Sequence, residues 1–233
     1  MAMRVKAVLF DLGGTMIDSA ELYETFRRIL KLNGITRSSQ AVKKAMLKAE
    51  HELKRDYGNE VPKDADYYIR WNLSILRILD VHERDKELAE QIDKHWFDYM
   101  EIRPHAGLSD ILGTLKERGV KIGIVTNGYE SDLEKILPKL RLGDVFDILV
   151  AADTIGKKKP NPDIFLYTIK RLNVKPNETV FVGDEYENDY LGAEKAGLFP
   201  ILLQVKGRKM QRNLPAEINV IHSLPELLSK IEI

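Results

Sequence analysis

The sequence of 233 residues contains no cysteine, no apolar run long enough to cross a membrane and no excess charge of either sign. Without cysteine the chain has no disulfide, no thiolate metal site and no cysteine nucleophile. Its 36 basic and 36 acidic residues cancel, so no long-range field draws it to nucleic acid or to an anionic membrane. All the chemistry must therefore come from other side chains.

The first residues lead directly into an apolar segment and lack the charged, apolar and small-residue regions of a signal peptide. No stretch approaches the roughly 20 apolar residues of a membrane helix. We therefore expect a cytoplasmic protein with neither membrane nor nucleic acid among its partners.

An apolar segment from Val5 to Phe10 stops at Asp11, and two glycines follow at Gly13 and Gly14. A short apolar run bounded by turn residues is typical of a buried strand. We expect a strand whose carboxyl end opens into a tight loop carrying Asp11.

Residues 19–95 give no comparable strand signal, and their apolar residues recur at the spacing of a helix face. Pro62, Lys63 and Asp64 interrupt the pattern, which indicates two helical halves joined as a hairpin in a small bundle. The helical spacing is clearest at Leu22, Phe26, Ile29 and Leu30 and at Ile69, Leu73, Leu76 and Leu79.

After Pro104 strands alternate with amphipathic helices, which predicts a parallel sheet covered by helices on both faces. The predicted fold class is α/β, with a Rossmann-like parallel sheet core and a helical domain inserted after the first strand. We expect the core domain at residues 1–18 and 96–233 and the inserted domain at residues 19–95. The later strands are expected at residues 120–126, 146–151, 179–182 and 199–203.

Polar residues follow the ends of the expected strands. Because ligands of parallel α/β sheets bind beyond the carboxyl ends of the strands, we expect these residues to converge on one site. They are Asp11 after the first strand, Thr126, Asn127 and Gly128 after the second, Lys159 in the loop after the third, and Gly183 and Asp184 after the fourth, with Asp189 five residues further on.

This set of side chains suits phosphoryl transfer. A carboxylate attacks phosphorus only when the negative charge of the phosphoryl group is offset, which magnesium bound by oxygen ligands achieves. Asp11 and Asp184 would supply carboxylates to the ion. The side chains of Thr126 and Asn127, nearby backbone N–H groups and the ammonium of Lys159 suit the remaining phosphoryl oxygens.

Four short motifs carry these residues. They are FDLGGT at residues 10–15, TNG at 126–128, KPNP at 159–162 and GD at 183–184, followed by Asp189. In this order and spacing they resemble the motifs of the haloacid dehalogenase superfamily, and the resemblance spans nearly the whole chain. It implies a magnesium-dependent phosphatase of small phosphorylated metabolites, with residues 19–95 as the mobile cap that closes over the substrate.

The resemblance also implies a role for each matching residue. Asp11 matches the nucleophile that forms an aspartyl-phosphate, Thr126 a hydroxyl that holds the phosphoryl group, and Lys159 the lysine that stabilises both. Asn127 and Gly128 complete the expected substrate-binding loop. The expected magnesium ligands are Asp11, the backbone carbonyl of Gly13, Asp184 and Asp189, the last directly or through water.

The chain departs from the family at Gly13. Family phosphatases carry a second aspartate there, which protonates the leaving alcohol and then activates water. General acid–base catalysis of this kind is worth about 10²–10⁴-fold, so we expect slow turnover, except with leaving groups that need little protonation. Asp18 or an acid of the inserted domain is a candidate replacement.

Two other functions stay open on the sequence alone. Haloacid dehalogenases also lack the second aspartate and use an aspartate that attacks carbon, but they dispense with magnesium and replace the Gly-Asp pair found here at residues 183–184. A non-catalytic chain that binds a metabolite or a protein partner would explain Gly13, although it has no physical need for Asp11, Thr126 and Lys159. The oligomeric state stays open too, because an amphipathic helix suits a buried cap face and a dimer interface equally.

Overall fold

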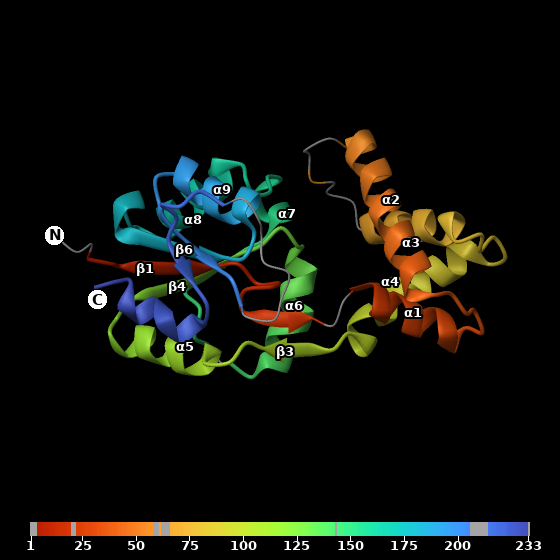
Figure 1. The fold of residues 1–233 in the computed structure, drawn as a ribbon, viewed down its shortest axis with the longest axis horizontal. Helices are drawn as coiled ribbons and strands as arrows, with labels where there is room; N and C mark the ends of the chain where they lie inside the picture. The colour runs from red at the N-terminus through yellow and green to blue at the C-terminus, as the bar shows by residue number, and fades with distance from the viewer. Residues whose placement is uncertain are drawn as a thin grey trace. The chain divides into compact units, whose positions relative to one another are not determined.

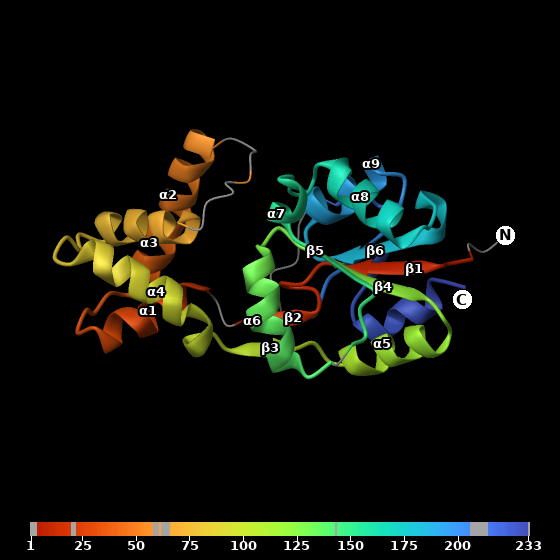
Figure 2. The same ribbon diagram turned by 180° about the vertical axis from the view of Figure 1, so that it is seen from behind.

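The computed structural model describes residues 4–19, 22–57, 61, 66–142, 144–205 and 214–232. The chain divides into two compact units, one formed by Met1–Asp18 with Arg103–Ile233 and the other by Ser19–Ile102. Figures 1 and 2 show both units from opposite sides. The helix break expected at residues 62–64 lies outside the described residues.

The first unit contains a six-stranded parallel sheet with the strand order β5-β4-β1-β6-β7-β8. Phe10 at the end of β1 is in register with Ile124 of β4 and Val182 of β6, so these strands end side by side. The residues that follow them therefore share one edge of the sheet. The strands are β1 (Ala7–Phe10), β4 (Lys121–Val125), β5 (Ile148–Val150), β6 (Thr179–Gly183), β7 (Phe199–Leu203) and β8 (Val220–Ile221).

Helices cover both faces of this sheet, with α8 and α9 on one side and α5 on the other (Figure 1). All four residues of β1 are buried because the strand lies inside the sheet and under both helical layers. Phe165 of α8 packs edge-on against Phe181 of β6, with ring centroids 4.9 Å apart. The α-helices of this unit are α5 (Leu108–Glu117), α6 (Glu130–Leu140), α7 (Ala152–Ile155), α8 (Pro162–Leu172) and α9 (Leu191–Lys195), and it also contains the 3₁₀ segments η1 (Pro176–Glu178) and η3 (Leu224–Ser229) and the π-helical segment η2 (Tyr186–Tyr190).

The predicted α/β class and the four later strands are confirmed, each strand within a few residues of its expected ends. The two-stranded sheet of β2 (Ile17–Ser19) and β3 (Ile102–Pro104) is not predicted from the sequence. Three residues are too few to show the alternation that marks a longer strand.

The second unit consists of four helices around its own apolar core. Helix α1 packs against α2 and α4, and α3 packs against the same two helices. The most buried members of the core include Phe26, Leu30, Ile75 and Ile92. The helices are α1 (Leu22–Leu32), α2 (Ser39–Tyr57), α3 (Tyr67–Ile78) and α4 (Asp85–Tyr99).

The inserted unit ends later in the chain than predicted. Helix α4 continues through residue 95, and the chain returns to the first unit only at Arg103. Trp96 and Tyr99 pack against the core of the helical unit, so the last turn of α4 belongs to that unit.

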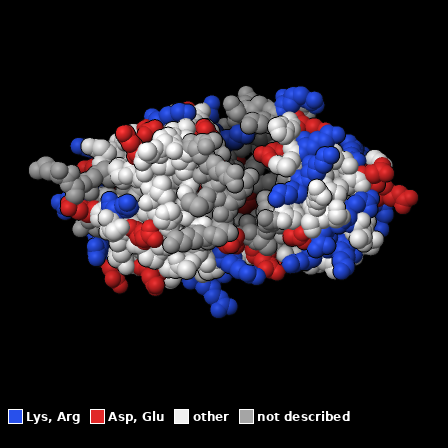
Figure 3. Space-filling model, viewed as in Figure 1, with Lys and Arg blue, Asp and Glu red and all other residues white. Residues whose placement is uncertain are grey.

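No described helix combines the length and hydropathy that a membrane crossing requires. On the face drawn in Figure 3, basic and acidic side chains both occur over each unit. That face therefore carries charges of both signs, in keeping with the equal totals in the sequence.

Candidate active site

Three carboxylates and one ammonium meet at the carboxyl edge of the sheet. One carboxylate oxygen from each of Asp11, Asp184 and Asp189 lies within 4.8 Å of the others. Lys159 Nζ donates to Asp11 Oδ1 and to Asp189 Oδ1, both at 2.6 Å. Because Asp11, Lys159 and Asp189 are all buried, these charges interact with little screening by water.

The loop after β1 holds Asp11 and Asp184 close together. The backbone N–H of Asp11 donates to the carbonyl of Val182, which continues the pairing of β1 with β6. The buried hydroxyl of Thr15 donates to Asp184 Oδ1 at 3.0 Å. Gly14 has φ +91°, and a Cβ atom there would lie 2.3 Å from Asp184 Oδ2, so the loop requires glycine at this position.

A tight turn after β6 places Asp189 beside the end of that strand. The turn is the π-helical segment η2, and the backbone N–H of Glu185 donates to Asp189 Oδ2 at 2.9 Å. A Cβ atom at Gly183 would lie 2.3 Å from Asp189 Cβ. The close approach of Asp189 therefore depends on glycine at the end of β6.

The loop after β4 contains Thr126, Asn127 and Gly128. Thr126 is buried, and its Oγ1 accepts from the backbone N–H of Gly128 at 3.1 Å, which leaves the hydroxyl hydrogen able to donate. The Asn127 side chain forms two hydrogen bonds with the backbone of Lys159, 32 residues later in the chain. Gly13 is exposed, and its backbone bridges to Ile17.

Burial and mutual repulsion oppose the ionisation of the acidic groups. Burial raises the pKa of Asp11 to about 7, against the opposing effect of Lys159. Burial, followed by the charge of Asp189, raises the pKa of Asp184 to about 6. Burial alone would lower the pKa of Lys159, but Asp11 and Asp189 raise it above its ordinary value. When all three carboxylates are ionised, the single ammonium leaves the cluster with excess negative charge.

Two contacts at the site are not predicted from the sequence. No role is expected for Thr15, although its position in the FDLGGT motif, four residues after Asp11, is an available signal. Asn127 is expected to bind substrate, whereas its observed partner is the backbone of Lys159.

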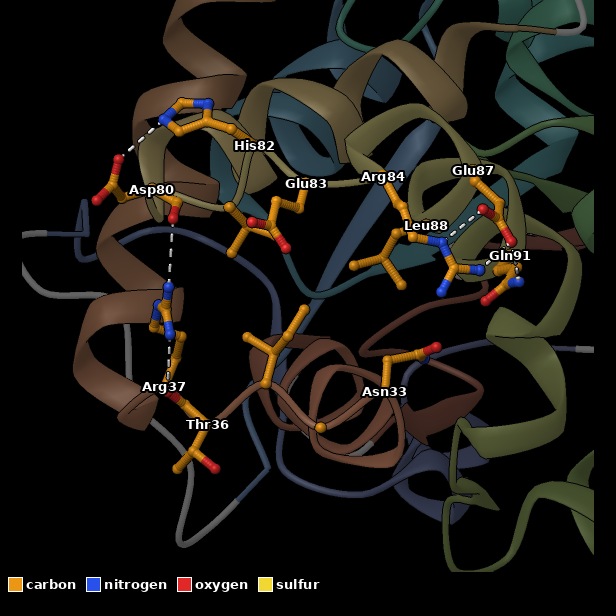
Figure 4. A pocket seen from close by; sticks show the side chains of 13 residues that line it. Asn33, Thr36, Arg37, Asp80, His82, Glu83, Arg84, Glu87, Leu88 and Gln91 are labelled. Carbon is orange, nitrogen blue, oxygen red and sulfur yellow. Dashed lines mark hydrogen bonds and ion pairs between the residues drawn. The ribbon is translucent and has the colours of Figure 1, made fainter.

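A separate pocket of ≈ 620 Å³ lies within the helical unit and contains none of the predicted site residues. It is lined by the connections between α1 and α2 and between α3 and α4 (Figure 4). Two pairs of its charged side chains bond to each other, Arg84 to Glu87 and His82 to Asp80, and Arg37 donates to the backbone carbonyl of Leu79. This internal pairing gives no indication of a catalytic centre.

The chain is similar to known proteins along most of its length. The sequence profile described as haloacid dehalogenase-like hydrolase matches residues 5–197. A glyceraldehyde 3-phosphate phosphatase of Pyrococcus furiosus is 32% identical over 234 residues, covering 98% of this chain and 94% of that protein. The crystal structure of a HAD phosphatase from Thermococcus onnurineus has a TM-score of 0.63 at 28% identity and covers 98% of this chain and 100% of its own. A dehalogenase solved with an intermediate has a TM-score of 0.72 over 99% of both chains, but at 22% identity this likeness concerns the fold alone.

Proposed function

The chain belongs to the haloacid dehalogenase-like hydrolases, and we propose that it hydrolyses small phosphate monoesters through an aspartyl-phosphate on Asp11. The proposal rests mainly on the 2.6 Å contact between Asp11 and the buried ammonium of Lys159, beside two further carboxylates. Attack on carbon by an aspartate has no need of those extra carboxylates, whereas a metal-assisted attack on phosphorus uses them. A sequence relative that covers 98% of the chain is a phosphatase by name.

Asp11 is the nucleophile in this proposal. Its carboxylate oxygen forms a bond to phosphorus while the ester P–O bond breaks, and the departing alkoxide takes up a proton to leave as the alcohol. A water molecule then attacks phosphorus, the bond to Asp11 breaks, and inorganic phosphate leaves with the carboxylate restored. Lys159 and the Thr126 hydroxyl stabilise the phosphoryl oxygens during both displacements.

The acidic residues fit a magnesium ion, which we propose as the cofactor. Magnesium prefers carboxylate and carbonyl oxygen ligands, and one carboxylate oxygen from each of Asp11, Asp184 and Asp189 lies within 4.8 Å of the others. Both oxygens of Asp189 already accept hydrogen bonds, so Asp189 suits a contact through water. Asp11, Asp184 and the carbonyl of Gly13 would hold the ion directly. When bound, it would offset the charge of the phosphoryl group.

The proton for the leaving alcohol has no donor at residue 13, because glycine has no side chain. The leaving groups of acyl phosphates and of esters of acidic alcohols depart without much protonation. These substrates should therefore be hydrolysed faster than alkyl phosphates. The physiological substrate would then be turned over slowly, or would receive its proton from another acid such as Asp18.

We further propose that the helical unit acts as a cap over the substrate. It forms a separate compact unit with its own core. A domain that moves as a rigid body requires such a core. Closure of such a unit would exclude bulk water while the phosphoryl group is transferred to Asp11, and would select small substrates. Glyceraldehyde 3-phosphate is a suitable first metabolite to test, given the named relative.

The decisive experiment compares wild type and Asp11→Asn on p-nitrophenyl phosphate, acetyl phosphate and glyceraldehyde 3-phosphate, with and without magnesium. We expect magnesium-dependent release of phosphate by wild type and none by Asp11→Asn, with circular dichroism showing the same fold. Full activity in Asp11→Asn would eliminate the covalent mechanism. Inert wild type that still binds magnesium would favour a metabolite-binding protein, and turnover of a haloacid without magnesium would favour the dehalogenase reaction.

A further inference from the structure

We propose that Asn127 is a positioning residue that holds Lys159 in place, and is not a ligand of the phosphoryl group. The inference rests on the proposed function, because Lys159 matters there as the group that stabilises the nucleophile and the phosphate. Asn127 of the TNG motif would then act on catalysis through Lys159 of the KPNP motif.

The two residues are joined by a pair of complementary hydrogen bonds. The backbone N–H of Lys159 donates to Asn127 Oδ1 at 2.7 Å, and Asn127 Nδ2 donates to the carbonyl of Lys159 at 3.1 Å. Rotating the amide by 180° would oppose donor to donor and acceptor to acceptor, so the bonds fix its orientation. The side-chain oxygen of Asn127 and one of its two N–H groups thus both bond to the backbone of a single residue.

The loop that carries Lys159 is held on either side of that residue, where the N–H of Lys157 donates to the carbonyl of Ala152 and the N–H of Asn161 to the carbonyl of Lys158. It lies between α7 and α8, outside regular structure, and Pro160 and Pro162 have no backbone N–H to donate. The backbone groups of Lys159 therefore need partners from elsewhere in the chain. Asn127 supplies one for each of them.

Asn127 can serve this purpose because its own loop is held firmly. The backbone N–H of Thr126 donates to the carbonyl of Val150, and the carbonyl of Gly128 accepts from Ala152. The N–H of Tyr129 donates to Asp132 Oδ2, which caps the start of α6. The residues flanking Asn127 are thereby tied to β5, α7 and α6.

The position of Lys159 has to be accurate because its ammonium touches two carboxylates at 2.6 Å. Misplacing a catalytic group by about 1 Å can reduce the rate about 10²-fold. By contrast, a phosphate ligand must donate hydrogen bonds, and Asn127 has one N–H left for that purpose. The geometry therefore favours an effect on Lys159 over a direct contact with substrate.

A double-mutant cycle separates the two roles. Asn127→Ala in the wild-type background should lower kcat about 10–100-fold, a loss similar to that caused by removing a residue that orients a metal ligand, while KM changes little. In the Lys159→Ala background the same substitution should leave kcat nearly unchanged, because the group it positions is gone. Asn219→Ala is the matched control, because Asn219 also donates to a backbone carbonyl, that of Pro200 near the start of β7. It should leave kcat unchanged.

A crystal structure of Asn127→Ala provides a readout that does not depend on activity. We expect the Lys159 ammonium to move out of hydrogen-bond range of Asp11, and this result decides the question if Lys159→Ala fails to fold. An unmoved Lys159, or an equal loss of kcat from Asn127→Ala in both backgrounds, would overturn the inference in favour of direct phosphate binding. If wild type hydrolyses no ester, the proposed function fails, but the crystal structure still tests the link from Asn127 to Lys159.

Discussion

The ammonium of Lys159 lies 2.6 Å from the carboxylate of Asp189, and both side chains are only 2% exposed. Since the same ammonium also contacts Asp11, removing it would leave two buried carboxylates without a cation between them. We predict that Lys159→Ala lowers the free energy of unfolding by about 3–5 kcal/mol without magnesium and reduces turnover to a residual rate, by more than Asn127→Ala does. Urea unfolding followed by circular dichroism measures the first effect, and phosphate release measures the second.

The exposed neighbour Lys157 provides the control for this prediction. Lys157→Ala removes the same charge two residues away and should change neither the urea midpoint nor kcat appreciably. Magnesium should restore part of the stability lost in Lys159→Ala, because it would neutralise the same carboxylates. An unchanged unfolding midpoint in Lys159→Ala would contradict the buried ion-pair account.

The main lines of the fold follow from local patterns. The apolar run before Asp11 and the strand-helix alternation after Pro104 each extend over enough residues to reveal their period. The end of the helical unit does not follow from a local pattern, because the last turn of α4 is fixed by the packing of Trp96 against helices far away in the chain. Tertiary packing of this kind leaves no signature in the neighbouring sequence.

For the site, the sequence predicts which residues come together but not which of them form hydrogen bonds with one another. Residue types at strand ends predict that Asp11, Lys159 and Asp184 share one edge, because parallel strands align their carboxyl ends. Which groups bond to one another depends on how separate loops fold. The partnership of Asn127 with the backbone of Lys159 is invisible in spacing alone, since the two lie 32 residues apart.

Replacing Asp184 by asparagine should have opposite effects with and without magnesium. Asparagine retains an acceptor for Thr15 but removes one charge from a cluster in which burial already raises the pKa of Asp184. At alkaline pH without magnesium we expect Asp184→Asn to melt at a higher temperature than wild type, because repulsion among the carboxylates is relieved.

Magnesium should reverse that order. At a concentration 100 times its Kd it would stabilise wild type by about 2.7 kcal/mol, and it should stabilise Asp184→Asn far less. Thermal melting across a magnesium titration measures both effects. Asp98→Asn, at an exposed carboxylate of α4, is the control expected to follow wild type. Equal magnesium responses in wild type and Asp184→Asn would remove Asp184 from the ligand set.

The glycine at residue 14 should be essential for the geometry of the acidic cluster. Gly14→Ala would force a side chain into a left-handed conformation and set its Cβ 2.3 Å from Asp184 Oδ2. We expect a loss of at least about 1–2 kcal/mol of stability and weaker magnesium binding, since Asp184 must move. Gly113→Ala is the control, because a Cβ there meets open space within helix α5. Alanine at that position should be neutral or stabilising. Isothermal titration with magnesium and urea unfolding compare the two variants, and equal behaviour would refute the strain argument.

A carboxylate at residue 13 should accelerate the reaction most for esters whose leaving alcohol has a high pKa and therefore needs a proton. A Cβ atom at Gly13 meets nothing within 4 Å, so Gly13→Asp can be accommodated without displacing a neighbour. We predict that Gly13→Asp raises kcat by about 10²-fold for alkyl phosphates, the lower end of what general acid catalysis contributes. The gain should shrink for p-nitrophenyl phosphate and nearly vanish for acetyl phosphate.

Gly13→Asn separates proton transfer from the mere presence of a side chain. It has nearly the shape of aspartate but no acidic proton, so it should stay at or below the wild-type rate on every ester. If Gly13→Asp and Gly13→Asn behave alike, or if Gly13→Asp is no faster on alkyl phosphates, the missing proton donor does not limit this enzyme. The proton would then have to come from another group, for which Asp18→Asn in the wild-type background is the next variant to measure.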